Sequence, residues 1–407
     1  MVLAAILAVS LLTFGIGVFL SNQSPDLATY TAKAQEMYKD ARSFVEKIRG
    51  VTLPDVPLVV ITKAWAQQTW GGSGSSQNLK NTLRDENVYK GVFLMREDES
   101  LVQAQTEWTG YWVAVTWKDQ IYVVREYFNP FHATSEATLV HELTHIMQGT
   151  LDSPPTPYTF DAIKARAALN EGDATFMADF YLNNSQTPTY TPLKATAKKA
   201  NSPGIQLSCP SQVAPSIPQS ILKIDYFAYD YGKRFISTLY AKEGWVEVNA
   251  AYANPPTTTA QILNPEEYYQ NITAQPVSSL PSPGQDWTHV KYTQYGEYFI
   301  FSVLNTWLPT DQAKASTDGW RGDNLTYYEK GNEYLFTWNI VWQSQSEASS
   351  FSESFQNMTD AAGASRNSNG NWYTNGRYLS IGQEDNNSTI ITCSNNETAI
   401  RALGEKL

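Results

Sequence analysis

The sequence is poor in charged residues and has no excess of basic ones. Only 17% of its 407 residues are charged, and the formal net charge is −11. Such a chain lacks the basic stripe that neutralises phosphates, which argues against a nucleic-acid-binding protein. It also contains no G-x-G-x-x-G, P-loop or G-x-S-x-G motif. Neither a nucleotide-binding protein nor a serine hydrolase is therefore indicated.

Cysteine is nearly absent, with only Cys209 and Cys393 in the chain. The two lie far apart and do not form the C-x-x-C pair of a cysteine-rich zinc site. In an oxidising compartment we predict a disulfide between them, which the chain-entropy argument values at about 5 kcal/mol for so long a loop. The alternative is two free thiols that behave as small buried residues.

Histidine is scarce too, but two of the four copies, His141 and His145, lie in one segment with the sequence HELTH. Residues four apart share one face of an α-helix, so both imidazoles can reach one metal ion. Glu142 lies one step round the helix, where it can act as the general base of a metallopeptidase. The alternative is a polar helix face that matches HExxH by chance.

A zinc site of this type needs a third protein ligand. The metzincin continuation is absent, but a second helical pattern follows over residues 162–181 and carries Glu171 and Asp173 at its centre. These two residues point about 200° apart on a helix, so only one of them can bind the metal. We predict Glu171 as the ligand. Gly172 would let another helix approach closely.

The combination of HELTHxxQ with AALNEGDAT resembles the gluzincin branch of the zincin peptidases, which have a peptidase-MA-like fold. More closely, it resembles a family of largely uncharacterised, secreted or membrane-anchored prokaryotic proteins with HELTHALQ, ALVEGDAT, PYxxG and PPTSTxQILHP motifs. The resemblance covers roughly residues 40–355, including Gly296-Glu297 and the segment Gly319–Asp323. It implies one Zn²⁺ per chain, held by His141, His145 and Glu171.

Two further residues take their interpretation from this resemblance. Tyr229 matches the tyrosine of PYxxG and is a candidate oxyanion donor, the alternative being an ordinary aromatic residue in a tyrosine-rich chain. Asn264 stands where the family has a histidine in ILHP. If that histidine stabilises the tetrahedral intermediate, asparagine can still donate a hydrogen bond but cannot carry a positive charge.

The N-terminal segment suggests a membrane location. Residues 2–20 contain no charged side chain, and about 20 helical residues span roughly 30 Å, the thickness of a bilayer core. We predict a retained transmembrane anchor, with a cleaved signal peptide as the alternative. The remainder would lie at the cell surface, or be secreted if the segment is removed.

Glycosylation sequons are frequent and support an extracellular location. One of them, at Asn22, is followed by Pro25 and is not counted as a candidate. The candidate sites are Asn183, Asn271, Asn324, Asn357, Asn386, Asn387 and Asn396.

We predict an α+β protein with four parts: an anchor (1–21), a helix that either forms a stalk or packs on the body (22–50), a gluzincin-like catalytic domain (51–285) and a C-terminal α+β portion (286–407). The catalytic domain would contain a mixed sheet, the HExxH helix and the third-ligand helix. Residues 111–125 favour a β-hairpin around Lys118-Asp119, because two apolar runs flank a short polar turn.

These observations predict a membrane-anchored extracellular zinc metallopeptidase that hydrolyses peptide bonds through a water activated by the metal. Its partners would be a peptide or protein substrate and the membrane. The alternative is a catalytically retired peptidase-like protein that serves as a structural or accessory subunit of a cell-envelope or membrane complex, since fold alone does not determine function.

Overall fold

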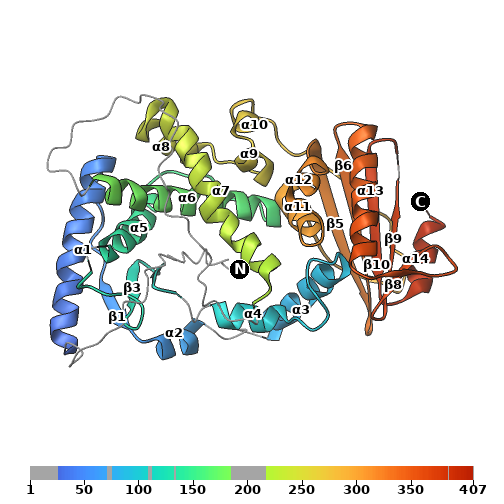
Figure 1. Ribbon diagram of the computed structural model, residues 1–407, viewed down its shortest axis with the longest axis horizontal. Helices are drawn as coiled ribbons and strands as arrows, with labels where there is room; N and C mark the ends of the chain where they lie inside the picture. Colours follow the sequence, from blue (N-terminus) through green and yellow to red (C-terminus); the bar gives the residue numbers. More distant parts are fainter. Residues whose placement is uncertain are drawn as a thin grey trace.

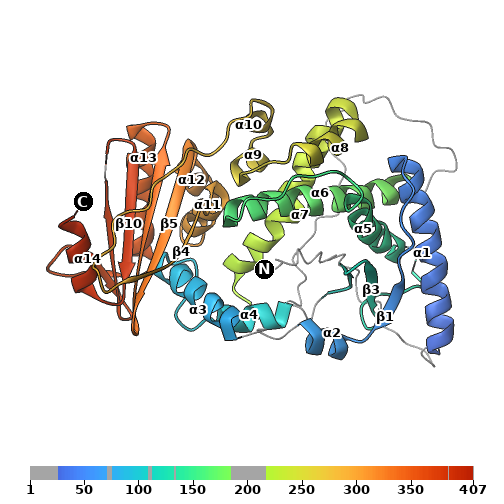
Figure 2. The same ribbon diagram turned by 180° about the vertical axis from the view of Figure 1, so that it is seen from behind.

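The structure is a computed structural model, and it describes residues 26–70, 76–108, 112–132, 134–184, 217–383 and 385–406. These residues form an elongated α+β fold (Figures 1 and 2). A small sheet lies near one end and a larger sheet near the other, and long helices fill the space between them.

The small sheet has the strand order β1-β3-β2. Strand β1 (Leu58–Ile61) pairs in parallel with β3 (Gln120–Val124), and β2 (Ala114–Trp117) pairs with β3 in antiparallel orientation. Lys118 and Asp119 in the connecting turn both have positive φ angles, of 49° and 56°. Such a turn matches the twist of a hairpin, and the predicted hairpin is confirmed. Strand β2 is thereby left at the edge of the sheet.

The HELTH segment forms α5 (Ser135–Gln148), and α1 (Leu27–Arg49) packs along it. Helix α1 begins after Asp26, whose carboxylate accepts the Thr29 backbone N–H at 2.8 Å, and ends at Gly50 in the left-handed conformation. Its residues Tyr30, Ala34, Tyr38, Ala41 and Val45 form one buried stripe. The helix predicted within residues 22–50 is therefore confirmed, and it packs on the body rather than projecting as a stalk.

Helix α6 (Phe160–Asn184) carries the NEGDAT segment and lies between α5 and α7 (Gln219–Glu243). Glycines allow the contact between α6 and α7. A Cβ atom at Gly172 would lie 2.2 Å from the backbone of Gly232, and one at Gly232 would lie 2.2 Å from the carbonyl oxygen of Ala168. The close approach predicted for Gly172 is thus present, and its partner is the glycine of the Tyr229-x-x-Gly232 segment.

This contact predicts the effect of Gly232→Ala. Alanine normally stabilises a helix relative to glycine by up to about 1 kcal/mol. Here the added methyl group collides with rigid backbone, so we expect a net loss of about 1–3 kcal/mol in the free energy of unfolding. Chemical denaturation would measure it. The control is Gly404→Ala in α14 (Glu397–Gly404), where a Cβ meets open space. Equal effects of the two changes would contradict the packing argument.

The large sheet is antiparallel, with the order β4-β5-β6-β10-β9-β8-β7. Its strands are β4 (Thr288–Thr293), β5 (Trp320–Lys330), β6 (Glu333–Trp342), β7 (Ser365–Arg366), β8 (Trp372–Thr374), β9 (Arg377–Gly382) and β10 (Ser388–Ser394). The remaining helices are α2 (Lys63–Trp70), α3 (Ser76–Gly91), α4 (Leu101–Trp108), α8 (Trp245–Ala253), α9 (Thr259–Leu263), α10 (Pro265–Tyr269), α11 (Glu297–Asn305), α12 (Thr310–Ala315) and α13 (Gln345–Ala361).

Helix α3, which was not predicted from the sequence, packs against the large sheet. Its residues Val88 and Tyr89 belong to the same hydrophobic core as Phe336 in β6. The Arg84 guanidinium also pairs with both carboxylate oxygens of Glu329 in β5, at 2.7 and 2.8 Å. The core of the large sheet therefore includes residues from before the predicted boundary at 286.

Two predictions about the fold need correction. Among the described residues, no helix is long and apolar enough to cross a membrane. The fold prediction was wrong in adding a transmembrane helix to the α+β body, and residues 2–20, where it was placed, lie outside the described residues. The predicted disulfide is also not seen. Cys393 is a free thiol, fully buried in β10, and Cys209 lies outside the described residues.

The candidate glycosylation sites differ in exposure. Asn183, Asn271, Asn357 and Asn386 are exposed, whereas Asn324, Asn387 and Asn396 are partly buried. The Nδ2 group of Asn324 donates to the carbonyl oxygen of Val277 at 2.8 Å, and that of Asn387 donates to Trp342. The Asn396 side chain caps α14. Only the four exposed asparagines present a side chain that is not already engaged in this way.

Candidate metal centre

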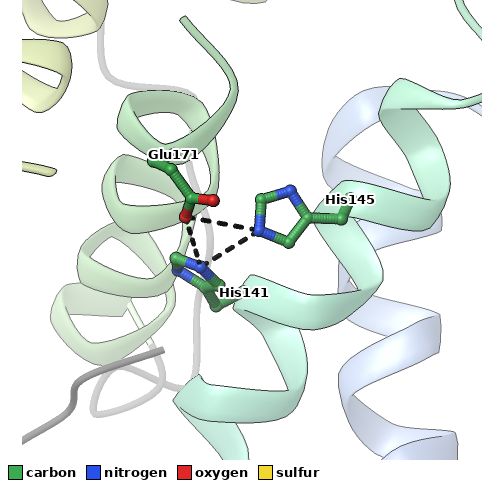
Figure 3. Close-up of side chains that lie close together, drawn as sticks. All are labelled: His141, His145 and Glu171. Carbon is green, nitrogen blue, oxygen red and sulfur yellow. Dashed lines mark hydrogen bonds and ion pairs between the residues drawn. The ribbon is translucent and has the colours of Figure 1, made fainter. Parts of the chain in front are cut away.

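Helices α5 and α6 bring His141, His145 and Glu171 together (Figure 3). The Nε2 atom of His141 lies 3.2 Å from Glu171 Oε2 and 3.2 Å from His145 Nε2, and His145 Nε2 lies 3.5 Å from the same carboxylate oxygen. One ligand atom from each residue thus falls within 4.8 Å of the other two. The three residues that the sequence analysis selected as ligands converge on one point.

The burial of these groups fits a metal ion. His141 and Glu171 are 3% and 2% exposed, and among the described residues Glu171 Oε2 is paired only with the Nε2 atoms of the two histidines. A buried carboxylate is costly unless its charge is paired, and a divalent cation between the three groups would supply that pairing when both histidines are neutral ligands. Two imidazoles and one carboxylate are also the ligand set of thermolysin-type catalytic zinc sites, in which the fourth position stays open.

Gln148, one turn after His145, orients the His145 ring. The Gln148 Nε2 group donates to the backbone oxygen of Asn170 at 2.8 Å, which turns its Oε1 toward His145 Nδ1 at 2.9 Å. Because Oε1 can only accept, Nδ1 carries a proton and Nε2 faces the other two ligands. Such a partner fixes both the tautomer and the direction of a metal-binding imidazole. The Q of HELTHxxQ therefore has a defined role at this site.

Without metal, the site holds a proton. Burial opposes a charge on His145, but the Glu171 carboxylate outweighs it and raises the pKa of His145 to about 9. Burial raises the pKa of Glu171, yet the neighbouring histidines overcome this and lower it to about 2. At pH 7 the metal-free pair is therefore an imidazolium and a carboxylate.

We expect metal binding at pH 7 to release about one proton, because the cation must displace the proton on His145 Nε2. The sign follows from the raised pKa of His145: affinity should increase by about tenfold per pH unit as the pH rises, and level off near pH 9. Calorimetric titration with Zn²⁺ in buffers of different ionisation enthalpy would count the protons. A count of zero at pH 7 would contradict this description.

Asp173, the rival ligand, faces the opposite side of α6. Its Oδ1 accepts Arg49 Nη1 of α1 at 2.7 Å, and its Oδ2 accepts the Tyr252 hydroxyl at 2.9 Å. The side chains of Asp173 and Arg49 are both fully buried. Asp173 is thus committed to a buried ion pair that joins α1 to α6, while Glu171 is directed at the histidines.

Glu142, the predicted general base, is fully buried beside the two histidines on α5. The Thr116 hydroxyl donates to Glu142 Oε2 at 2.7 Å and also lies 3.2 Å from its backbone oxygen. Thr116 lies in the edge strand β2, and the sequence analysis did not select it. The available signal was its place in the hairpin that precedes the HExxH helix.

Tyr229, the candidate oxyanion donor, is buried in α7 with its ring stacked over that of His141. The ring centroids lie 6.3 Å apart and the rings are inclined by 15°. The glycine contact with α6 lies one turn further along α7, at Gly232. Close packing of the two helices therefore brings the tyrosine of this segment to the histidine pair.

The segments around Asp161, Thr259, Gly296 and Asp323 form a buried joint away from the candidate metal centre. Asp161, at the start of α6, accepts the backbone N–H of Thr259 at 2.7 Å. Asp323 accepts the backbone N–H groups of Tyr295 and Gly296 at 2.8 and 2.9 Å. Gly296 has a φ of +80°, and a Cβ there would lie 1.9 Å from Asp161. These segments tie the start of α6 to the large sheet.

Asn264 is exposed at the junction of α9 and α10. Its neighbours Leu263 and Pro265 line a cavity shared with α7, α11 and α12, and none of the three candidate ligands lines that cavity. The structure therefore gives no support for a catalytic role at this position.

Comparison with known proteins adds one match. Residues 285–403 match the family described as a domain of unknown function (DUF8575). This segment contains the large sheet and leaves out α5 and α6, which carry the candidate ligands. No curated protein and no solved structure matches the chain.

Proposed function

We propose that this protein is a zinc-dependent metallopeptidase. One observation carries the proposal: His141, His145 and Glu171 converge from two helices with Glu142 beside them. A purely structural metal site has no need of a general base in that position. The described residues also supply three ligands rather than four, which suits a catalytic site with an open position.

The roles of the side chains follow from their positions. A divalent metal ion at this site would polarise a peptide carbonyl and make water more acidic. Glu142 accepts the proton of the attacking water and passes it to the leaving amine, and the Thr116 hydroxyl orients its carboxylate. Gln148 holds the His145 ring in place. Tyr229 supplies a second stabilising group for the developing oxyanion.

Strand β2 gives a reason to expect a peptide substrate. It lies at the edge of the small sheet, and its residue Thr116 contacts the proposed general base. An exposed sheet edge can bind an extended peptide through backbone hydrogen bonds. A peptide paired with β2 would pass beside Glu142 and the candidate ligands.

The test is the metal content of the purified protein, together with cleavage of a mixed peptide library before and after chelation. We expect one zinc per chain and cleavage that chelation abolishes and zinc restores. Bound zinc without cleavage at neutral and acidic pH would favour an accessory protein built on a peptidase scaffold. A protein that binds no metal would contradict the proposal.

We expect Tyr229→Phe to lower kcat by about 100-fold, the usual effect of removing one oxyanion donor. The phenyl ring keeps the stacking on His141, so zinc content should not change. Steady-state kinetics on a cleaved peptide would separate kcat from KM. An unchanged kcat would reduce Tyr229 to a packing residue.

We also propose that the protein works outside the cell. The exposure of four candidate glycosylation sites supports this proposal: Asn183, Asn271, Asn357 and Asn386. The intact mass of protein from its native source, before and after deglycosylation, tests this. A mass equal to that of the bare polypeptide would count against glycosylation.

A further inference from the structure

A cavity of about 470 Å³ opens beside His145, at the C-terminal end of α5. Its walls come from the edge strand β2, the end of α5, the loop between α5 and α6, helix α6 and helix α8. Thr116 and Gln148, which contact the proposed general base and one candidate ligand, both line it. A substrate held at the metal centre would therefore place a neighbouring group in this cavity.

Among the described residues that line this cavity, Arg166 is the one with a permanently charged side chain. It lies on α6 and is only 6% exposed. Its Nη1 donates to the Ser153 hydroxyl and its Nη2 to the backbone oxygen of Pro154 at 2.9 Å. Its Nε–H is buried and has no hydrogen-bond partner in the part of the chain that the structure describes. Both acceptors are neutral, so they leave the charge uncompensated.

No carboxylate among the described residues forms an ion pair with Arg166. The comparison with Arg49 is informative, because that equally buried arginine is paired with Asp173 at 2.7 Å. A buried charge without a partner is costly. The protein as a whole carries a net charge of −11, so an unpaired cation in this cavity runs against the general charge of the chain.

We propose that this cavity is a specificity subsite in which Arg166 binds a carboxylate of the substrate next to the scissile bond; this inference rests on the proposed peptidase function. A carboxylate in the cavity would compensate the buried charge, and it could accept the second N–H of Nη1 and of Nη2, each of which uses one N–H for Ser153 or Pro154. Guanidinium and carboxylate also match in geometry, which makes arginine well suited to such recognition. The carboxylate can come from an aspartate or glutamate side chain or from the C-terminus of the peptide.

The first experiment compares matched peptides with the zinc-loaded protein. One set carries Glu or Gln at each position flanking the cleavage site, with both ends blocked, and a second set has a free or amidated C-terminus. We expect a 10- to 100-fold higher kcat/KM for the carboxylate member of one set. A preference in the first set assigns the subsite to an acidic side chain, and one in the second assigns it to a terminal carboxylate. Equal values in both sets would overturn the inference.

Variants connect the preference to Arg166. Arg166→Gln should bring the ratio of kcat/KM between the paired peptides close to one, and Arg166→Lys should retain part of it. The matched control is Arg234→Gln in α7, an exposed arginine next to a different cavity, which should leave the ratio unchanged. A ratio that survives in Arg166→Gln would place the carboxylate elsewhere.

A binding measurement separates this inference from the proposed function. Calorimetric titration of the Glu142→Gln variant with the same peptides needs no turnover. Preferential binding of the carboxylate peptide that disappears in the Glu142→Gln/Arg166→Gln double variant supports the subsite even if the native protein cleaves nothing. Cleavage of peptides without any such preference would overturn the subsite and leave the peptidase function intact.

Discussion

Glu142→Gln is expected to reduce peptide hydrolysis by about 10²- to 10⁴-fold while the zinc content stays at one per chain. General-base catalysis contributes an effect of this size, and a neutral amide cannot accept the proton of the attacking water. Glutamine has the shape of glutamate and can still accept the Thr116 hydroxyl, which lies 2.7 Å from Glu142 Oε2. The local structure and the ligands on either side should therefore persist.

The measurement is kcat/KM on a cleaved peptide, with metal content determined on the same sample. Glu136→Gln is the matched control, because Glu136 lies in the first turn of the same helix and is not part of the site. We expect the control to keep its activity. Full activity in Glu142→Gln would refute the proposed mechanism even if zinc were bound as described.

The largest effect on stability is expected for Asp173→Ala, at about 3–5 kcal/mol in the free energy of unfolding. Removing one partner of a buried ion pair leaves the other charge without compensation. Here that charge is Arg49, whose side chain is fully buried and lies 2.7 Å from Asp173 Oδ1. The Tyr252 hydroxyl would lose its acceptor as well. The change should weaken the packing of α1 against α6 without removing a metal ligand.

Denaturant unfolding of the metal-free protein would measure this loss. Asp179→Ala is the control, because Asp179 lies on the same helix but forms a partly exposed ion pair with Lys233. Such pairs contribute at most about 1 kcal/mol. Equally small losses of stability in Asp173→Ala and Asp179→Ala would contradict the inference that the buried pair of Arg49 and Asp173 stabilises this part of the fold.

The contrast between Glu171 and Asp173 shows what can be predicted from the sequence and what cannot. In an α-helix, residues two apart point in different directions, so only one of Glu171 and Asp173 can bind the metal. The choice of Glu171 could be predicted from its resemblance to a known motif. The partner that occupies Asp173 could not, because Arg49 lies 124 residues earlier in the chain and no local pattern links the two positions.

The roles of Thr116 and Arg166 were likewise beyond sequence analysis. Thr116 reads as an ordinary strand residue until the hairpin is placed against α5, where its hydroxyl meets Glu142. From the sequence, Arg166 is an ordinary polar residue of a helix. Only the fold shows that the loop between α5 and α6 covers it. Both assignments depend on contacts between separate elements, and such contacts leave no periodic signal along the chain.

The two predictions that needed correction, the transmembrane helix and the disulfide, also rested on features of the sequence alone. An uncharged run over residues 2–20 is sufficient to suggest a membrane helix. The residues that the structure describes contain none, and residues 2–20 are not among them. The predicted disulfide rested only on the presence of two cysteines. In the structure Cys393 is packed in the core beside Phe336 and Gly91, a site that suits a small apolar side chain.

By itself, the sequence determined the helices α1, α5 and α6, the hairpin and the convergence of two histidines on one helix face, because each follows from spacing over a few residues. The tertiary structure decided which acidic residue faces those histidines, which hydroxyl contacts the proposed base, and where an unpaired arginine opens into a cavity. These features require residues distant in the sequence to meet, and burial then decides which charged groups are paired and which are left for a ligand.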